Sequence, residues 1–314
     1  MEAIGGYFGL ELQSGNHYHS GSNCVKLNTG RNCLEYILKI NNYSKIYLPY
    51  FTCDVLLEPL VKLDSSYELY HVDENLEPIF DYDNVQPNEL FLYTNYFGLK
   101  DEYVNILSKY NINVAIDNAQ SFFSKPLSGM DTFYSARKFI GVADGAYLYT
   151  NILDNDVIKK DFSGGRLSHL ITRLDKSAEE GYNEFSINDL SLIGQPILQM
   201  SGFTESVLQS LDYNIIKEKR VENYDFLHSN LSTLNKFKVL KNISQIPMVY
   251  PFWTDDKTLR QRLLDNKIYC AKYWPNVKNW NGSFLECEMA EHIIHLPIDQ
   301  RYSIEDMKKI INNV

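Results

Sequence analysis

The stretch ELFLYTNYFGLKDEYVNILSKYNINVAID, residues 89–117, decides the predicted fold. Its first and last segments, residues 89–98 and 113–117, are apolar and strand-like, whereas residues 100–110 repeat with the period of an amphipathic helix. A helix between two strands is typical of parallel pairing, because parallel neighbours need a crossover connection. We therefore expect an α/β fold built outward from this unit.

The same alternation continues on both sides of the unit and predicts a large, mostly parallel sheet with helices on both faces. After about residue 183 the pattern changes to longer helices with two strand-like segments near residues 245–253 and 291–299. We expect a large α/β domain at residues 1–182, followed by a helical connection and a small α+β domain at residues 183–314.

Composition narrows the function. The chain has 314 residues and a formal net charge of −10, so a basic nucleic-acid-binding face is not expected. Its 5 cysteines include no CxxC pair, which favours reduced thiols and argues against a zinc site or other metal centre. The first residues resemble no signal peptide and no apolar run is long enough to span a bilayer. We expect a cytoplasmic protein with no membrane partner.

Polar residues gather where strands of the predicted sheet end, which is where open α/β sheets bind ligands. A carboxylate ends one strand, an amide follows it, a hydroxyl and a lysine follow the next strand, and a small Gly-containing turn opens a helix. A helix start of this kind is an anion site. In the same order, these residues are Asp117, Gln120, Ser135, Lys138 and the segment Thr29, Gly30 and Arg31.

Each of these residues alone has an ordinary reading, since Asp117 would suit a turn and Lys138 a solvated face. Their combination predicts a site for pyridoxal phosphate. A lysine amine forms an imine with the cofactor aldehyde, and a carboxylate pairs with the pyridinium nitrogen. A helix start can hold the phosphate.

Several longer segments resemble one family in order along nearly the whole chain. They are LNTGRNCLEYIL, IYLPYFTCDVL, AIDNAQSFFSKP, FYSARKFIGVADGAY, EEGYNEFS and HLPIDQRYSIEDMKKI. Together they resemble the DegT-type (DegT/DnrJ/StrS) sugar aminotransferases, which are pyridoxal-phosphate enzymes of fold type I. The most specific part is Asp117-x-x-Gln120 followed by Ser135-x-x-Lys138.

The resemblance implies a role for each matching residue. Lys138 would be the Schiff-base lysine, Asp117 would face the pyridine nitrogen, and Gln120 would lie near the ring hydroxyl. The phosphate would be bound by Ser135 and by the helix start, and an Asn would reach the phosphate of the neighbouring subunit of a homodimer. The helix-start residues are Thr29, Gly30, Arg31 and Asn32, and the Asn is Asn183.

Three departures from the family are visible. Cys53 stands where an aromatic usually stacks on the cofactor ring, so either Cys53 or a nearby aromatic, Phe51 or Tyr96, is expected to take that place. The Arg that often follows the family's Asn is absent after Asn183. The second half of the chain, which helps to select the substrate, is shorter than usual.

The implied activity is transfer of an amino group from glutamate to a nucleotide-linked keto sugar, in surface-polysaccharide or deoxyamino-sugar biosynthesis. A non-sugar ketone as acceptor and a non-catalytic regulatory or scaffold role stay open. Lys138 argues against a sugar 3-dehydratase, which typically has His at this position.

Three further expectations concern single side chains. Lys138 is expected to be buried among its apolar neighbours, and Arg137 to pair either with a structural acid or with an anionic group of the substrate. The segment His17-Tyr18-His19 could line a substrate entrance, but a surface loop is the expectation.

Overall fold

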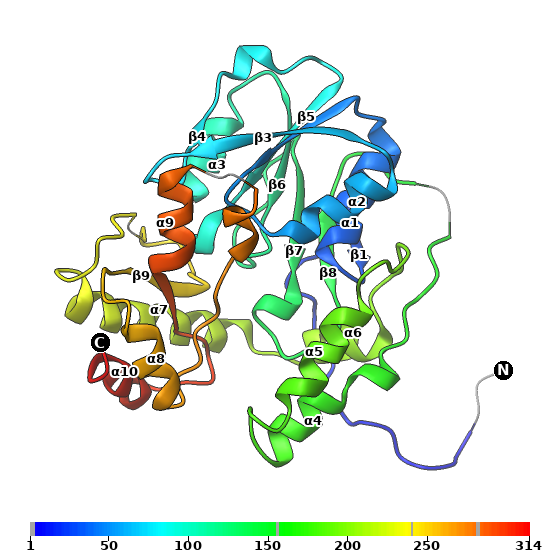
Figure 1. The fold of residues 1–314 in the computed structure, drawn as a ribbon. Helices are drawn as coiled ribbons and strands as arrows, with labels where there is room; N and C mark the ends of the chain where they lie inside the picture. Colours follow the sequence, from blue (N-terminus) through cyan, green and yellow to red (C-terminus); the bar gives the residue numbers. More distant parts are fainter. Residues whose placement is uncertain (1–3, 155–156, 240, 281–282) are drawn as a thin grey trace.

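The computed structural model describes residues 4–154, 157–239, 241–280 and 283–314, and its main feature is a large sheet (Figure 1). The sheet confirms the α/β class. Its strands are β1 (Cys24–Leu27), β2 (Lys45–Pro49), β3 (Ser66–Val72), β4 (Pro78–Ile79), β5 (Glu89–Thr94), β6 (Asn113–Asp117), β7 (Asp131–Ser135) and β8 (Ala146–Tyr149).

The strand order is β1-β8-β7-β6-β5-β2-β3-β4. The central strands β3, β2, β5, β6 and β7 pair in parallel, while β8, β1 and β4 pair antiparallel at the two sides. The deciding stretch folds as β5, then α3 (Asp101–Leu107), then β6, as the sequence predicts. The parallel strands therefore end together at one edge.

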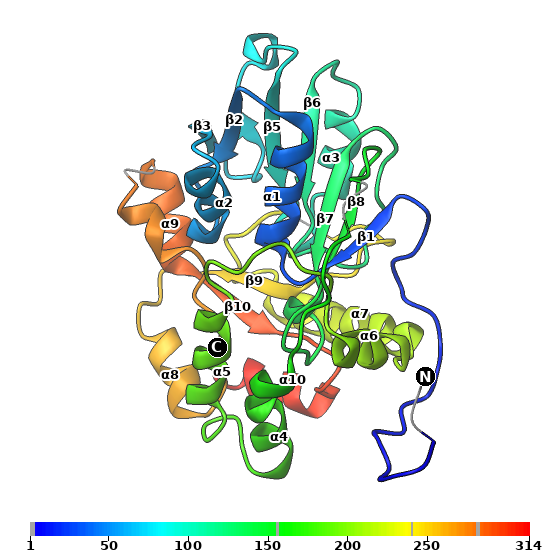
Figure 2. The same cartoon turned by 90° about the vertical axis from the view of Figure 1, so that its right-hand side faces the viewer.

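Helices cover the two faces of the sheet (Figure 2). On β5, Leu90 and Leu92 belong to the core under the first two helices, whereas Phe91 and Tyr93 belong to the core on the opposite face. This alternation is the period of a strand buried on both sides. The first helices are α1 (Gly30–Asn41) and α2 (Leu57–Lys62), preceded by the 3₁₀ turn η1 (Asp54–Leu56).

Pro59 lies in the first turn of α2, a position that tolerates proline because its missing N–H would have no intrahelical acceptor there. The other 3₁₀ turns are η2 (Tyr82–Asn84), η3 (Tyr96–Gly98), η4 (Ala136–Lys138), η5 (Gly164–Arg166) and η6 (Pro275–Lys278). The remaining helices are α4 (Ser168–Asp175), α5 (Tyr182–Ser191), α6 (Gly202–Gln209), α7 (Tyr213–Leu231), α8 (Leu259–Asp265), α9 (Phe284–His292) and α10 (Ile304–Ile311).

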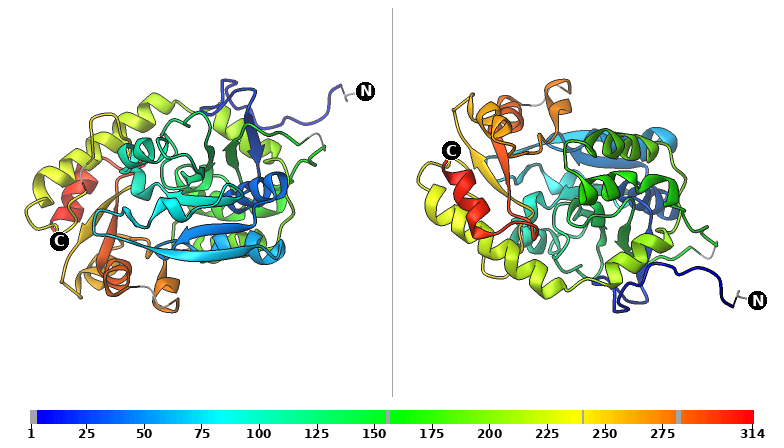
Figure 3. Two further views of the ribbon diagram at one scale, coloured as in Figure 1. Left: turned by 90° about the horizontal axis from the view of Figure 1, so that it is seen from above. Right: turned by 90° about the horizontal axis from the view of Figure 1, so that it is seen from below.

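The second half of the chain builds a separate antiparallel pair, β9 (Val249–Trp253) with β10 (Ile293–Pro297). The strand expected from residue 291 begins at Ile293, because α9 continues through His292. Helices α7 and α10 lie side by side against this pair (Figure 3). The domain boundary expected between residues 182 and 183 falls in the first turn of α5, and the division into domains stays a prediction.

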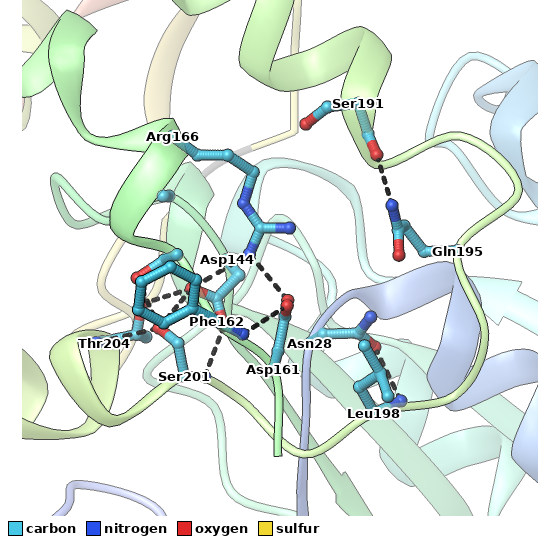
Figure 4. A network of polar contacts seen from close by, with 12 residues as sticks. Asn28, Asp144, Asp161, Phe162, Arg166, Ser191, Gln195, Leu198, Ser201 and Thr204 are labelled. Atoms are coloured by element: carbon cyan, nitrogen blue, oxygen red, sulfur yellow. Dashed lines mark hydrogen bonds and ion pairs between the residues drawn. The ribbon is translucent and has the colours of Figure 1, made fainter. Parts of the chain in front are cut away.

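A buried polar network joins the turn before β8 to α6 (Figure 4). The Asp144 carboxylate, fully buried, accepts hydrogen bonds from Ser201 N at 2.7 Å, Ser201 Oγ at 2.7 Å and Thr204 Oγ1 at 2.6 Å. Arg166 Nη2 lies 4.0 Å from the same carboxylate. The network gives this buried charge a full set of partners.

His19 corrects one expectation. It is 2% exposed and not part of a surface loop, since its ring packs 4.0 Å from the Tyr134 ring, centroid to centroid. Its Nε2 contacts Phe122 O at 2.7 Å, and burial lowers its pKa to about 4. The segment before β1 is therefore packed on the sheet at this point.

Among the residues that the structure describes, no helix is both long and apolar enough to cross a membrane.

Candidate functional site

The predicted site residues of β6 and β7 emerge at one edge of the sheet. Asp117, the last residue of β6, pairs with Thr94 on β5 and with Phe133 on β7. Ser135 is the last residue of β7, and η4 with Lys138 follows it directly. Parallel pairing therefore brings Asp117, Ser135 and Lys138 to the same edge, as expected from their positions in the sequence.

Lys138 itself is exposed, so the expected burial is wrong. Its neighbours Phe139, Ile140 and Val142 are buried, but η4 directs the lysine side chain out of that core. Its Nζ lies 5.1 Å from the centroid of the Tyr273 ring. A cation over an aromatic face keeps a favourable contact without burial, so the amine stays reachable.

Asp117 is the buried acid of the site. It is 7% exposed, and its Oδ1 accepts a hydrogen bond from Ala119 N at 2.8 Å. Burial raises its pKa to about 6, although the Ala119 N–H and the Lys138 ammonium pull it down. None of the ion pairs among the described residues includes Asp117. A carboxyl in this state favours a buried N–H donor as partner.

Gln120 is buried and half satisfied. Its Oε1 accepts a hydrogen bond from Phe97 N at 3.0 Å, which fixes the orientation of the amide. Its Nε2 is buried and has no hydrogen-bond partner within the described ranges. Phe97 holds a left-handed backbone, φ 57°, which is costly for a bulky residue and typical of functional turns. The amide thus presents an unfilled donor.

The start of α1 lies against the lysine turn. Thr29 caps the helix, since its Oγ1 accepts a hydrogen bond from Asn32 N at 3.2 Å. Asn28 O accepts from Gly145 N at 2.6 Å, and Gly145 O accepts from Ala136 N at 3.0 Å. The first N–H groups of a helix lack intrahelical acceptors and carry its positive end. This end therefore faces the site edge.

The side chains of Arg31 and Asn32 are already engaged. Arg31 Nη1 lies 2.5 Å from Glu58 Oε2, and Asn32 Nδ2 donates to Gln195 O at 3.0 Å. A ligand at the start of α1 would therefore meet their backbone and not their side chains.

The three candidates for a ring-stacking residue differ in access. Phe51 is 1% exposed and Tyr96 is fully buried, and both pack against Trp274. Cys53 is half-buried, and burial raises the pKa of its thiol while the Lys138 ammonium lowers it. Of the three residues, Cys53 is therefore the accessible one, and its thiol lies close enough to Lys138 for the ammonium to lower its pKa.

Arg137 pairs with a protein acid. Its Nη2 donates to Asp189 Oδ1 of α5 at 2.8 Å. Asn183, on the same helix, is exposed, and no hydrogen bond joins it to the other predicted site residues in the described part of the chain. Its expected role involves a neighbouring subunit.

Two neighbours of Lys138 were not expected. Tyr273 lies under the amine, and the His295 ring lies 4.4 Å from the Tyr273 ring, centroid to centroid. His295 Nδ1 contacts Ala271 O at 3.0 Å, and burial lowers the pKa of the imidazole to about 3, so it is neutral. No sequence signal marks these residues, because they reach the site only through packing of the second half of the chain.

No family model matches this chain, and no curated protein does. Solved structures do match it. DesV from S. venezuelae, in complex with a ketimine intermediate, shares 15% identity over 94% of this chain and 85% of that chain, with a TM-score of 0.65. The PLP form of the sugar aminotransferase Spr1654 from Streptococcus pneumoniae shares 16% over 92% and 85%, with a TM-score of 0.62.

A third match is a DegT DnrJ EryC1 StrS aminotransferase from Brucella abortus, with 13% identity over 92% of this chain and 84% of that chain and a TM-score of 0.61. At these identities the likeness is one of fold. The chain has the fold of these aminotransferases, which is the fold that the sequence motifs indicated.

Proposed function

We propose that this protein is a pyridoxal-phosphate-dependent aminotransferase that moves an amino group from glutamate to a nucleotide-linked keto sugar. The observation that carries the proposal is the meeting of Lys138, Asp117, Gln120 and the start of α1 at one sheet edge. The shared fold of the matched sugar aminotransferases supports it.

The residues present fit pyridoxal phosphate. The Gln120 Nε2 is a buried donor that lacks a partner among the described residues, which suits the ring hydroxyl. Asp117 is a buried carboxyl that takes part in no ion pair among the described residues, which suits the pyridinium N–H. The positive start of α1, with the backbone N–H groups of Gly30 and Arg31, suits the phosphate together with Ser135.

When bound, pyridoxal phosphate supplies an aldehyde and an electron-withdrawing ring. The chain supplies the rest. Lys138 would hold the cofactor through its amine and, when that amine is free, would serve as the acid–base group at its Nζ. The Asp117 carboxylate would pair with the ring nitrogen. Tyr273 supports the lysine side chain from below.

Cys53 is proposed to pack against the cofactor ring in place of the usual aromatic. Phe51 and Tyr96 support the fold instead, since the Tyr96 hydroxyl donates to Phe51 O at 2.9 Å and both rings are buried. A thiol is a small, polarizable contact, so a weaker hold on the ring than that of an aromatic is expected.

A homodimer that places Asn183 at the neighbouring phosphate is also proposed. Helices α4 and α5 present a group of exposed apolar side chains, more than isolated surface positions would need. These are Ile171, Leu174, Tyr182, Phe185, Ile187 and Leu190. A second copy is the occupant that a self-complementary face admits. Sedimentation of the wild type and of Leu174→Asp tests this, and a monomeric wild type would exclude it.

The function is tested in two steps. Purified protein mixed with pyridoxal phosphate is expected to gain an absorbance band near the visible edge that borohydride removes. The pyridoxamine-phosphate form is then mixed with nucleotide-linked 3-keto and 4-keto sugars while return of that band is followed. A band with no response to any sugar would leave a non-sugar ketone as the acceptor. Absence of the band would leave a scaffold role.

A further inference from the structure

A buried arginine on α7 is not used by the proposed cofactor site. Arg220 is 1% exposed, and inside a protein an arginine is expected to face a carboxylate. None of the ion pairs among the described residues includes it. Asp299, the acid whose charge acts on it, is held by Arg301 at 2.7 Å. Burial lowers the pKa of Arg220 to about 10, so it remains charged at neutral pH.

The donors of Arg220 reach oxygens of three separate segments. Its Nε donates to Gln300 Oε1 at 3.0 Å. Its Nη1 donates to Met248 O at 3.1 Å and to Pro247 O at 3.4 Å. Its Nη2 donates to Phe139 O at 3.4 Å, and the guanidinium carbon lies 4.6 Å from the centroid of the Phe139 ring. The guanidinium therefore connects the second half of the chain to the turn after β7.

The carbonyl that Arg220 contacts belongs to the residue directly after Lys138. Gln300 Nε2 donates to the same Phe139 O at 2.8 Å. A carbonyl oxygen has two lone pairs and can accept both bonds. Two side chains from outside the large sheet thus converge on one atom beside the lysine. Because η4 is a single 3₁₀ turn, these two bonds to the Phe139 carbonyl restrain the backbone directly after Lys138.

The segment around Met248, which Arg220 contacts, is also bonded to the turn on the Gln120 side of the site. Met248 N donates to Phe97 O at 2.8 Å, and Phe97 N donates to Gln120 Oε1 at 3.0 Å. The turn that orients Gln120 is therefore bonded directly to the segment around Met248, and the turn that carries Lys138 is joined to the same segment through the Arg220 guanidinium. This segment therefore links the position of Gln120 to that of the Lys138 turn.

We propose that Arg220 and Gln300 are positioning residues that hold the Lys138 turn through the Phe139 carbonyl. The proposal rests on the proposed function, in which Lys138 carries the cofactor. Neither side chain acts as a catalytic group. Their effect is to keep the lysine backbone at the distance from Asp117 and Gln120 that capture of the cofactor needs, because small misplacements slow reactions between held groups strongly.

The test measures capture of pyridoxal phosphate by cofactor-free protein. Samples are reduced with borohydride at set times, and the modified Lys138 peptide is counted by mass spectrometry. Arg220→Met is expected to slow capture by roughly tenfold or more. Gln300→Ala should slow it less, and the double variant should match Arg220→Met, since both side chains act on one carbonyl. Arg220→Lys should restore part of the rate.

The matched control is Arg260→Met. Arg260 also bonds backbone carbonyls, those of Cys270 at 3.2 Å and Ile293 at 3.5 Å, but neither belongs to the site edge. A similar slowing in this variant would show that loss of any carbonyl-bonded arginine is enough, and would overturn the proposal. Equal capture by wild type and by folded Gln300→Ala and Arg220→Lys would overturn it as well, whether or not Arg220→Met folds.

Hydrogen exchange separates this proposal from the proposed function. The Ile140 N–H, which donates to Ala136 O at 2.9 Å across η4, should exchange faster in Gln300→Ala than in wild type, and no faster in Arg260→Met. If wild type captures no cofactor, the proposed function fails. The difference in exchange rate then decides by itself whether Arg220 and Gln300 hold the Lys138 turn. If wild type captures cofactor and the exchange rates are equal, only the proposed positioning role of Arg220 and Gln300 fails.

Discussion

Asp117 and Asp144 are both buried carboxylates at the ends of the same sheet, but they are treated differently. Asp144 accepts hydrogen bonds from Ser201 and Thr204 (Figure 4), whereas, within the described part of the chain, the Asp117 carboxylate accepts one, from Ala119 N. A buried charge with full partners supports the fold, and one without them is costly. The difference indicates which of the two regions is reserved for a ligand.

The largest effect is expected at the lysine beside Asp117. Lys138→Ala should lose the cofactor absorbance band and lower transamination by about 10³-fold or more, because both the attachment point and the proton carrier are removed. Absorbance spectra and the rate of transamination with glutamate measure these effects, and Lys109→Ala, a change at an exposed lysine, is the control. Retention of both band and turnover in Lys138→Ala would rule out the proposed mechanism.

Asp144→Asn tests the structural half of the comparison. Asn keeps one acceptor oxygen but places an NH₂ donor where the other carboxylate oxygen was, so at least one donor of Ser201 or Thr204 loses its acceptor and the free energy of unfolding should fall by roughly 3 kcal/mol. Urea unfolding measures the change, and the exposed Asp83→Asn serves as the control. A loss below about 0.5 kcal/mol, the range of ordinary surface changes, would mean that the network is not a main support of the fold.

Asp117→Asn should raise the free energy of unfolding of the cofactor-free protein, whereas Asp144→Asn should lower it. Because the folded pKa of about 6 lies above the ordinary 3.8, the contribution of Asp117 to stability is full below pH 3.8 and is lost as pH rises through 6. At pH 7 the amide should therefore stabilise the protein, by ~3 kcal/mol at most. The gain should shrink as pH falls from 6 to 4.

Urea unfolding at several pH values checks this prediction, and cofactor affinity should fall in the same variant. If Asp117→Asn destabilises the cofactor-free protein at pH 7 as Asp144→Asn does, then Asp117 is a structural acid and the contrast between the two regions disappears.

The smallest effect is expected at Arg137. Its pair with Asp189 is partly solvated, with the acid side chain 55% exposed, so a double-mutant cycle of Arg137→Ala and Asp189→Ala should give about 0.5 kcal/mol of coupling. Turnover in Asp189→Ala should change less than threefold. A tenfold loss would mean that Asp189 holds Arg137 in place for substrate.

The site residues from the first half of the chain could be placed from the sequence because they lie at or just after strand ends. Asp117, Ser135 and Lys138 follow apolar strands, and parallel pairing brings such ends together. The state of the side chains was not predictable in the same way. Lys138 was expected to be buried from its apolar neighbours, but the direction of a side chain in a short turn depends on what packs there, which in this protein is Tyr273.

Residues from the second half of the chain were missed for a related reason. Arg220 lies in a helical segment whose charges resemble those of a solvated face, and Gln300 lies in a loop after β10. Each gains its place only when α7, the Met248 loop and the lysine turn come together. His19 was misread in the same way, since its neighbours Tyr134 and Phe122 are distant in sequence.

The α/β class, the order of strands and helices, and the sheet edge that carries the polar residues could all be inferred from the residues alone, because strand and helix periods and the direction of parallel strands are local properties. Which buried polar groups have partners, and which are left without them, depends on the packing of the folded chain. Asp117, Gln120 Nε2 and the Arg220 contacts differ from ordinary polar residues only through burial and distance. Those quantities are set by packing between distant segments, and no residue pattern contains them.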